Sequence, residues 1–183
     1  MENSIEFLND LCRKGDIEKI KEYFEIYGEN AVYNEYPIYW ASLNNYLDVL
    51  IKLFELEEKC GEVKYGEDAI DLASYYDRIN ILIKLFELEE KHGEVKYSKN
   101  AIDWASEYGH TNTIIKLFEL EEKYGEVKYS EYAINWASYN DSDTVDLLIK
   151  LTFWRFGGYI KTSLKSKEDI FRKTINLVRI GKI

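Results

Sequence analysis

Residues 69–98 read AIDLASYYDRINILIKLFELEEKHGEVKYS and residues 101–130 read AIDWASEYGHTNTIIKLFELEEKYGEVKYS, so that 22 of 30 aligned positions are identical. The two stretches are offset by 32 residues, and further copies at this offset begin at Pro37 and Ala133. A weaker copy, two residues out of step, covers residues 11–24. Self-similarity at a fixed period of about 20–50 residues is the signature of a repeat array. The sequence therefore predicts four clear repeats preceded by a divergent end unit.

Each repeat contains two helical patterns. The first, at about residues 99–108, is short and rich in Ala and Trp, and Ser98 and Ser130 are the expected N-caps of this helix and its next copy. The second begins near Asn112 and carries an apolar stripe at helical spacing, formed by Ile114, Ile115, Leu117, Phe118 and Leu120. We expect the opposite face to be solvated and to consist of Glu119, Glu121, Glu122 and Lys123.

A glycine follows the second helix in three of the repeats, at Gly61, Gly93 and Gly125. Glycine at this place is typical of a helix that ends on a residue with positive φ. Neither helix can bury its apolar stripe alone, so neighbouring repeats are expected to stack on one another. With one Pro and ten Gly in 183 residues, the chain has too few turn residues for a β-sandwich or barrel.

The charge is divided unevenly along the chain. The net charge is -10, which disfavours a protein that covers nucleic-acid phosphates over its whole surface. Residues 1–154 hold 16 basic and 32 acidic side chains, whereas residues 155–183 hold 8 basic and 2 acidic ones, giving -16 and +6. Residues 166–180 have the pattern of one amphipathic helix, with Ser166 as its N-cap. We interpret residues 155–183 as a basic capping segment for the last repeat.

The first helix resembles an ankyrin repeat. Residues 100–110, NAIDWASEYGH, look like the family's opening motif of Thr-Pro-Leu-His, one residue, Ala-Ala, two variable residues and Gly-His. Residues 36–42, YPIYWAS, place the only proline on the family's proline position. The Ala-Ile-Asp-Trp-Ala-Ser motif most resembles the ankyrin repeats of giant viruses that infect amoebae. The resemblance implies an all-α, elongated helix-turn-helix solenoid with short inter-repeat loops and a C-terminal capping helix. Residues 1–34 would be the divergent N-terminal cap and residues 35–154 four repeats, the last incomplete.

Two departures from the ankyrin pattern have structural consequences. The motif's histidine is replaced by Tyr39, Asp71, Asp103 and Asn135, so a bond to the next loop must use another group, and Asp or Asn can accept backbone N–H groups. The second helix is about one turn longer than usual and the following GEVKYS link is short. We therefore expect the protruding fingers that ankyrin proteins often use for binding to be reduced.

No grouping in the sequence indicates catalysis, a metal or a cofactor. His92 and His110 stand in different repeats, and with Cys12 and Cys60 they do not have the spacing of a zinc site. The acidic run at Asp141, Asp143 and Asp146 lacks the glycine and late Glu of a calcium loop. Paired acids such as Glu57-Glu58 and Glu89-Glu90 are expected on a solvated helix face. The prediction is a protein that is not an enzyme and has no small-molecule substrate.

Recurring aromatic residues are expected in the core. Trp40, Trp104 and Trp136 occupy one register of the first helix and are expected to wedge between helices. The tyrosines of the inter-repeat links also recur and are expected to pack those links: Tyr33, Tyr65, Tyr97 and Tyr129.

The candidate binding residues are those at which the repeats differ, because common packing does not dictate them. In the ankyrin family such positions face the concave binding surface. Tyrosine is enriched at protein interfaces, although these tyrosines could equally be ordinary surface residues of a Tyr-rich chain. The candidates are Tyr36, Leu43, Asn44, Asp68, Tyr75, Tyr76, Glu107, Tyr108, Tyr132, Tyr139 and Asn140.

The predicted function is that of a monomeric scaffold or adaptor that binds a protein partner with a basic surface. A self-associating protein, or an acidic decoy for nucleic-acid-binding proteins, are the alternatives. The N-terminus lacks a signal peptide pattern and no segment is long and apolar enough for a membrane span. With only two cysteines, an intracellular, cytoplasmic location is expected, in the host cytoplasm for a viral protein.

Overall fold

A computed structural model describes residues 2–124, 128–140 and 142–155. These residues form ten α-helices and one 3-10 helix, and no strand occurs among them. The fold is therefore all-α within the described residues, as predicted. None of the described helices is long and apolar enough to cross a bilayer. The predicted capping segment at residues 155–183 lies outside the described residues except for its first residue.

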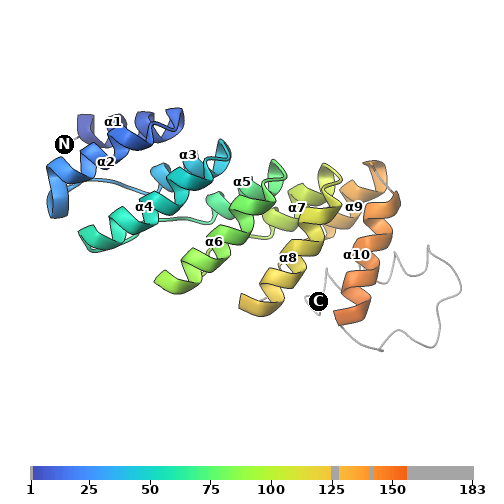
Figure 1. Cartoon of the computed structure of the whole chain (residues 1–183). Helices are drawn as coiled ribbons and strands as arrows, with labels where there is room; N and C mark the ends of the chain where they lie inside the picture. The colour runs from blue at the N-terminus through green and yellow to red at the C-terminus, as the bar shows by residue number, and fades with distance from the viewer. Residues whose placement is uncertain (1, 125–127, 141, 156–183) are drawn as a thin grey trace, which may run out of the picture. The chain divides into compact units, whose positions relative to one another are not determined.

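The chain divides into two compact units, Met1–Tyr97 and Ser98–Ile183. The first unit contains three antiparallel helix pairs (Figure 1). They are α1 (Glu2–Lys14) with α2 (Ile17–Tyr27), α3 (Tyr36–Leu43) with α4 (Leu47–Cys60), and α5 (Asp68–Tyr75) with α6 (Ile79–His92). The 3-10 helix η1 (Gly28–Asn30) follows α2. Helices α1, α3 and α5 pack in one layer, and α2, α4 and α6 in a second.

The second unit repeats this arrangement. It pairs α7 (Asn100–Glu107) with α8 (Thr111–Tyr124), and α9 (Glu131–Asn140) with α10 (Ser142–Arg155). Helix α7 packs against α9, and α8 against α10. The first helices α3, α5 and α7 have 8 residues each, and α9 of the fourth repeat has 10. The second helices α4, α6, α8 and α10 have 14 residues each. The predicted short and long helices are thus confirmed.

The turn inside each of the first four helix pairs contains one residue with positive φ. In three of the repeats this residue is Asn45 (φ 62°), Asp77 (φ 56°) or Gly109 (φ 69°), which follow one another at the 32-residue offset. In the divergent N-terminal pair, α1 and α2, the corresponding residue is Gly15 (φ 72°). Glycine, Asn and Asp are the residues that adopt this conformation most readily. The predicted glycines after α4 and α6 also have positive φ, 121° at Gly61 and 145° at Gly93. Gly125 lies outside the described residues.

The N-terminal ends of α7 and α9 are held by serines. The Oγ atoms of Ser98 and Ser130 accept the backbone N–H of the residue two positions later, at 3.0 and 3.2 Å. Asp103 of α7 in turn accepts the backbone N–H of Ser130 at 2.8 Å and also bonds its hydroxyl. The expected substitute for the motif's histidine is therefore an aspartate that ties one repeat to the start of the next.

Link tyrosines connect successive repeats, as predicted. Tyr33, Tyr65 and Tyr97 are buried. The ring of Tyr33 packs on Phe24 of α2, and the ring of Tyr65 packs on Phe54 of α4. The hydroxyl of Tyr33 donates to the carbonyl of Glu62 at 2.7 Å, and that of Tyr65 donates to the carbonyl of Glu94 at 2.9 Å. Each of these two tyrosines therefore reaches from one link to the next.

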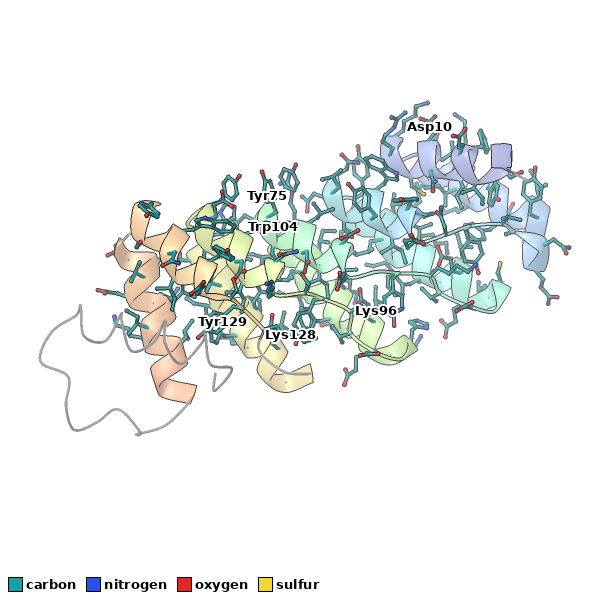
Figure 2. The ribbon with its side chains drawn as sticks, turned by 180° about the vertical axis from the view of Figure 1, so that it is seen from behind. Asp10, Tyr75, Lys96, Trp104, Lys128 and Tyr129 are labelled. Atoms are coloured by element: carbon teal, nitrogen blue, oxygen red, sulfur yellow. The ribbon has the colours of Figure 1, made fainter. Side chains whose placement is uncertain are left out.

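Three glutamates contradict the expectation of a solvated face. Glu57, Glu89 and Glu121 are fully buried. Their Oε2 atoms accept the backbone N–H of Lys64, Lys96 and Lys128, at 2.8, 2.7 and 2.9 Å. The prediction is wrong because each link folds back across its helix and needs an acceptor for its N–H group. Figure 2 marks Lys96 and Lys128, the two later link lysines.

The tryptophans are only half-buried, which contradicts their expected core position. Trp40, Trp104 and Trp136 keep part of their ring surface accessible, whereas the alanines beside them, Ala41, Ala105 and Ala137, are completely buried. The small alanine side chains are enclosed completely at these positions, whereas the larger indole rings are enclosed only in part.

Candidate functional site

The candidate residues fall into two sets on the first helices of the repeats. One set begins the helices: Tyr36 on α3, Asp68 on α5 and Tyr132 near the start of α9. The other set ends them: Leu43, Asn44, Tyr75, Tyr76, Glu107, Tyr108, Tyr139 and Asn140. An 8-residue helix rises about 12 Å, so within each unit the two sets lie at opposite ends of the first helices. We call the two sets the tyrosine rows, after their place in the repeat.

Five of the candidate tyrosines are exposed. The exposed fractions are 46% for Tyr36, 43% for Tyr76, 48% for Tyr108, 51% for Tyr132 and 85% for Tyr139. These helices bury their other face, as Ile38, Ile70, Ile102 and Ile134 are inaccessible. The variable tyrosines are therefore exposed although the helices that carry them are well packed on their other side.

The row at the helix ends is partly fixed by local contacts in the first unit. The rings of Tyr75 and Tyr76 meet edge to face, with their centres 4.6 Å apart. Figure 2 marks Tyr75 at the C-terminal end of α5. Leu43 is half-buried, and the Asn44 amide donates to the carbonyls of Trp40 at 3.0 Å and Arg13 at 3.4 Å. Asn44 therefore holds α3 against the end of α1, and the tyrosine pair provides the exposed contact area.

In the second unit two of the three exposed candidate tyrosines, Tyr108 and Tyr132, lie beside other rings. Tyr108 stacks on His110 with ring centres 6.0 Å apart, and Tyr132 stacks on Trp136 at 5.5 Å. Tyr139, the most exposed residue of the set, lies near the end of α9. Glu107 is half-buried, and the side chain of Asn140 lies outside the described ones. Stacked rings are restrained, which lowers the entropy lost when a partner contacts them.

A groove of about 460 Å³ lies between α1 and α3 in the first unit. Of the candidates it includes only Tyr36; its other lining residues are Glu6, Asn9, Asp10, Arg13 and Trp40. The repeat pattern does not predict these residues, because α1 belongs to the divergent end unit and Trp40 is expected in the core. The feature of the sequence that could have indicated the groove is the spacing of Glu6, Asp10 and Arg13, which places them on one face of a helix.

The ionisable groups of the groove differ in their pairing. Asp10 forms ion pairs with Arg13 and Lys14, and their hydrogen bonds hold the pKa of its carboxyl below its usual range. Glu6 is exposed and forms no ion pair with any described residue. The rings of Tyr36 and Tyr39 lie 5.9 Å apart and those of Tyr39 and Trp40 lie 5.0 Å apart, both edge to face. Two rings of α3, those of Tyr36 and Trp40, therefore line the same groove as the Glu6 carboxylate of α1.

The described residues contain no group of three or more His, Cys, Asp or Glu side chains arranged to hold a metal ion. Both cysteines are free; Cys12 is buried, and this burial raises its pKa. The Cys60 thiol donates to the carbonyl of Gly28 at 3.1 Å.

Comparisons with known proteins gave no match, either to protein-family models or to curated protein sequences.

Proposed function

We propose that the chain is a non-enzymatic, ankyrin-like repeat protein that binds a protein partner through its rows of exposed tyrosines. The observation that carries the proposal is the exposure of Tyr36, Tyr76, Tyr108, Tyr132 and Tyr139 at positions where the repeats differ. Tyrosine supplies a large, rigid contact surface with a polar tip at low entropic cost. Positions that packing does not constrain are those at which a binding surface is free to vary.

Three local features support an ankyrin-like repeat. The first three clear repeats each pair an 8-residue helix with a 14-residue helix, joined by a turn with one residue of positive φ. Asp103 bonds the start of the next repeat where the ankyrin motif has its histidine. The only proline, Pro37, lies in the first turn of α3, where a missing N–H is tolerated.

The charge of the repeats indicates the kind of partner. Residues 1–154 carry a net charge of -16. Near the tyrosine rows, Glu35, Glu67 and Asp68 are exposed. A partner with a basic surface would be attracted over about 10 Å at moderate salt, so association is expected to slow as salt is raised.

The test is capture of partners from a cell lysate by the intact protein and by a variant carrying Tyr76→Ala, Tyr108→Ala and Tyr139→Ala. The proposal expects the captured proteins to be lost with the triple variant while circular dichroism still shows the same helical content. The matched control is Tyr27→Ala, since Tyr27 is 44% exposed on α2 and also packs on a tyrosine, at 4.7 Å. Unchanged capture by the triple variant would contradict the proposal.

Self-association is a second candidate, favoured by the charge of +6 in residues 155–183 against -16 in the rest. Sedimentation at low and high salt separates the two. An oligomer that dissociates as salt is raised would support self-association, and a monomer at both salt concentrations would exclude it.

A further inference from the structure

The groove between α1 and α3 combines a cavity, a carboxylate without an ion pair among the described residues, and two aromatic rings. Its volume is about 460 Å³, which exceeds the size of one amino-acid side chain. Glu6 and Asp10 lie on the α1 wall, and Tyr36 and Trp40 on the α3 wall. The groove adjoins the start of α3 and so shares Tyr36 with the tyrosine row.

We propose that this groove binds an arginine side chain of the protein partner. The inference rests on the proposed function and names the chemistry of the partner's anchor residue. Charge complementarity indicates a cation, because Glu6 is unpaired and the surrounding repeats are strongly acidic. Aromatic faces attract cations, and a planar guanidinium both stacks on rings and bonds carboxylates through its fork of N–H groups.

The groove already accommodates one guanidinium. Arg13 lines it and contacts Asp10 through Nη2, at 2.5 Å, while its side chain stays 58% exposed. This pairing leaves Glu6 as the carboxylate for an incoming arginine, in a groove that Tyr36 and Trp40 also line. The same unit also contains a cation over an aromatic ring: Lys64 Nζ lies 5.2 Å from the centre of the Tyr33 ring. Such a contact contributes about 0.5–1 kcal/mol at an exposed site.

The probe is a capped Gly-Gly-Arg-Gly-Gly peptide, compared with peptides that contain citrulline or lysine at the central position. Citrulline has nearly the shape of arginine and no charge. The full-length protein is labelled with 5-fluorotryptophan, and the fluorine signal of Trp40 is assigned with Trp40→Phe. We expect the arginine peptide to shift the Trp40 signal saturably at millimolar concentration. The citrulline peptide should bind at least about fivefold more weakly, and the lysine peptide should bind between the two.

Two variants identify the carboxylate. Glu6→Gln is expected to weaken binding of the arginine peptide about threefold to fivefold, which corresponds to the loss of one exposed ion pair. The matched control is Glu22→Gln, which removes the same charge from the exposed face of α2. Equal binding of the arginine and citrulline peptides, tighter binding of lysine, or no loss with Glu6→Gln would each overturn the proposal. So would the absence of a saturable Trp40 shift up to about 20 mM peptide.

This test and the lysate capture fail independently. Tyr76, Tyr108 and Tyr139 do not line the groove, so the triple variant should bind the arginine peptide as the intact protein does. Loss of captured partners with normal peptide binding supports the tyrosine rows. Capture that survives Glu6→Gln, together with peptides that do not bind, refutes the groove and leaves the proposed function standing.

Discussion

The inter-repeat links and the tyrosine rows use the same kinds of residue in opposite ways. In the links, Tyr65 is buried and donates to a backbone carbonyl, and Glu89 is buried and accepts a backbone N–H. In the rows, Tyr76 and Asp68 are exposed. The link residues are identical from repeat to repeat, whereas the row residues differ. Residues that bond a neighbouring repeat must recur, because each repeat presents the same backbone groups to the next.

The largest expected effect is on stability and comes from the buried glutamates. Glu89→Ala removes the acceptor of the Lys96 N–H and leaves a cavity, so we expect a loss of about 3 kcal/mol in the free energy of unfolding. The control is Glu90→Ala, because Glu90 is the adjacent, exposed residue and should change stability by less than about 0.5 kcal/mol. Urea unfolding followed by circular dichroism measures both. Similar losses in the two variants would contradict the contrast between buried and exposed acids.

The pH dependence of stability is the second prediction. Burial raises the pKa of Glu57 from 4.5 to about 8 and that of Glu89 to about 9, and a backbone N–H bond only partly opposes this rise. The Oε1 atoms of both side chains have no hydrogen-bond partner among the described residues. Between pH 4.5 and about 9 the folded state therefore keeps protons that the unfolded state releases. Stability should decrease as the pH rises through this window.

Glutamine imitates the protonated glutamate, so the double variant Glu57→Gln and Glu89→Gln should be less sensitive to pH. Its advantage over the natural chain should be small near pH 5 and grow as the pH approaches 9. Urea midpoints at four pH values across this range measure the difference. We expect the urea midpoints of the two proteins to diverge as the pH rises. Parallel curves would show that these two carboxyls are ionised in the folded protein.

Loss of a tyrosine hydroxyl should lower the stability more in an inter-repeat link than in a tyrosine row. Tyr65→Phe removes the bond of 2.9 Å to the Glu94 carbonyl, so we expect a loss of about 1 kcal/mol. Tyr76→Phe removes a hydroxyl from a side chain that is 43% exposed, and the change should stay within about 0.5 kcal/mol. The two thermal midpoints, recorded under one condition, decide the matter. A cost at Tyr76 equal to that at Tyr65 would indicate that the row tyrosines are structural.

The smallest expected effect on the fold is the one that matters most for function. Tyr139→Ala alters a side chain that is 85% exposed, so its effect on stability should be close to zero. Under the proposed function the same change weakens partner capture. Measured together, stability and capture separate a binding residue from a packing residue, since the latter would lower both.

Helix positions could be predicted from the sequence because they follow from local rules. Apolar spacing, the serines at 98 and 130 and the glycines at 61 and 93 each act within a few residues of themselves. The burial of Glu57 could not be predicted in this way, because its helical position places it among charged neighbours. Only the return of the link brings the Lys64 N–H within 2.8 Å of it. The groove was missed for a similar reason, since it pairs α3 with a helix outside the clear repeats.

The sequence by itself determined the 32-residue period, the alternation of short and long helices and the division of charge into -16 and +6. The tertiary structure alone decided which chemically equal residues became interior and which stayed accessible. Glu57 lies inside and Glu58 outside although they are neighbours, and Tyr65 is buried whereas Tyr76 is exposed. The physical reason is that a buried polar group must find a bonding partner, and that partner belongs to a segment distant along the chain.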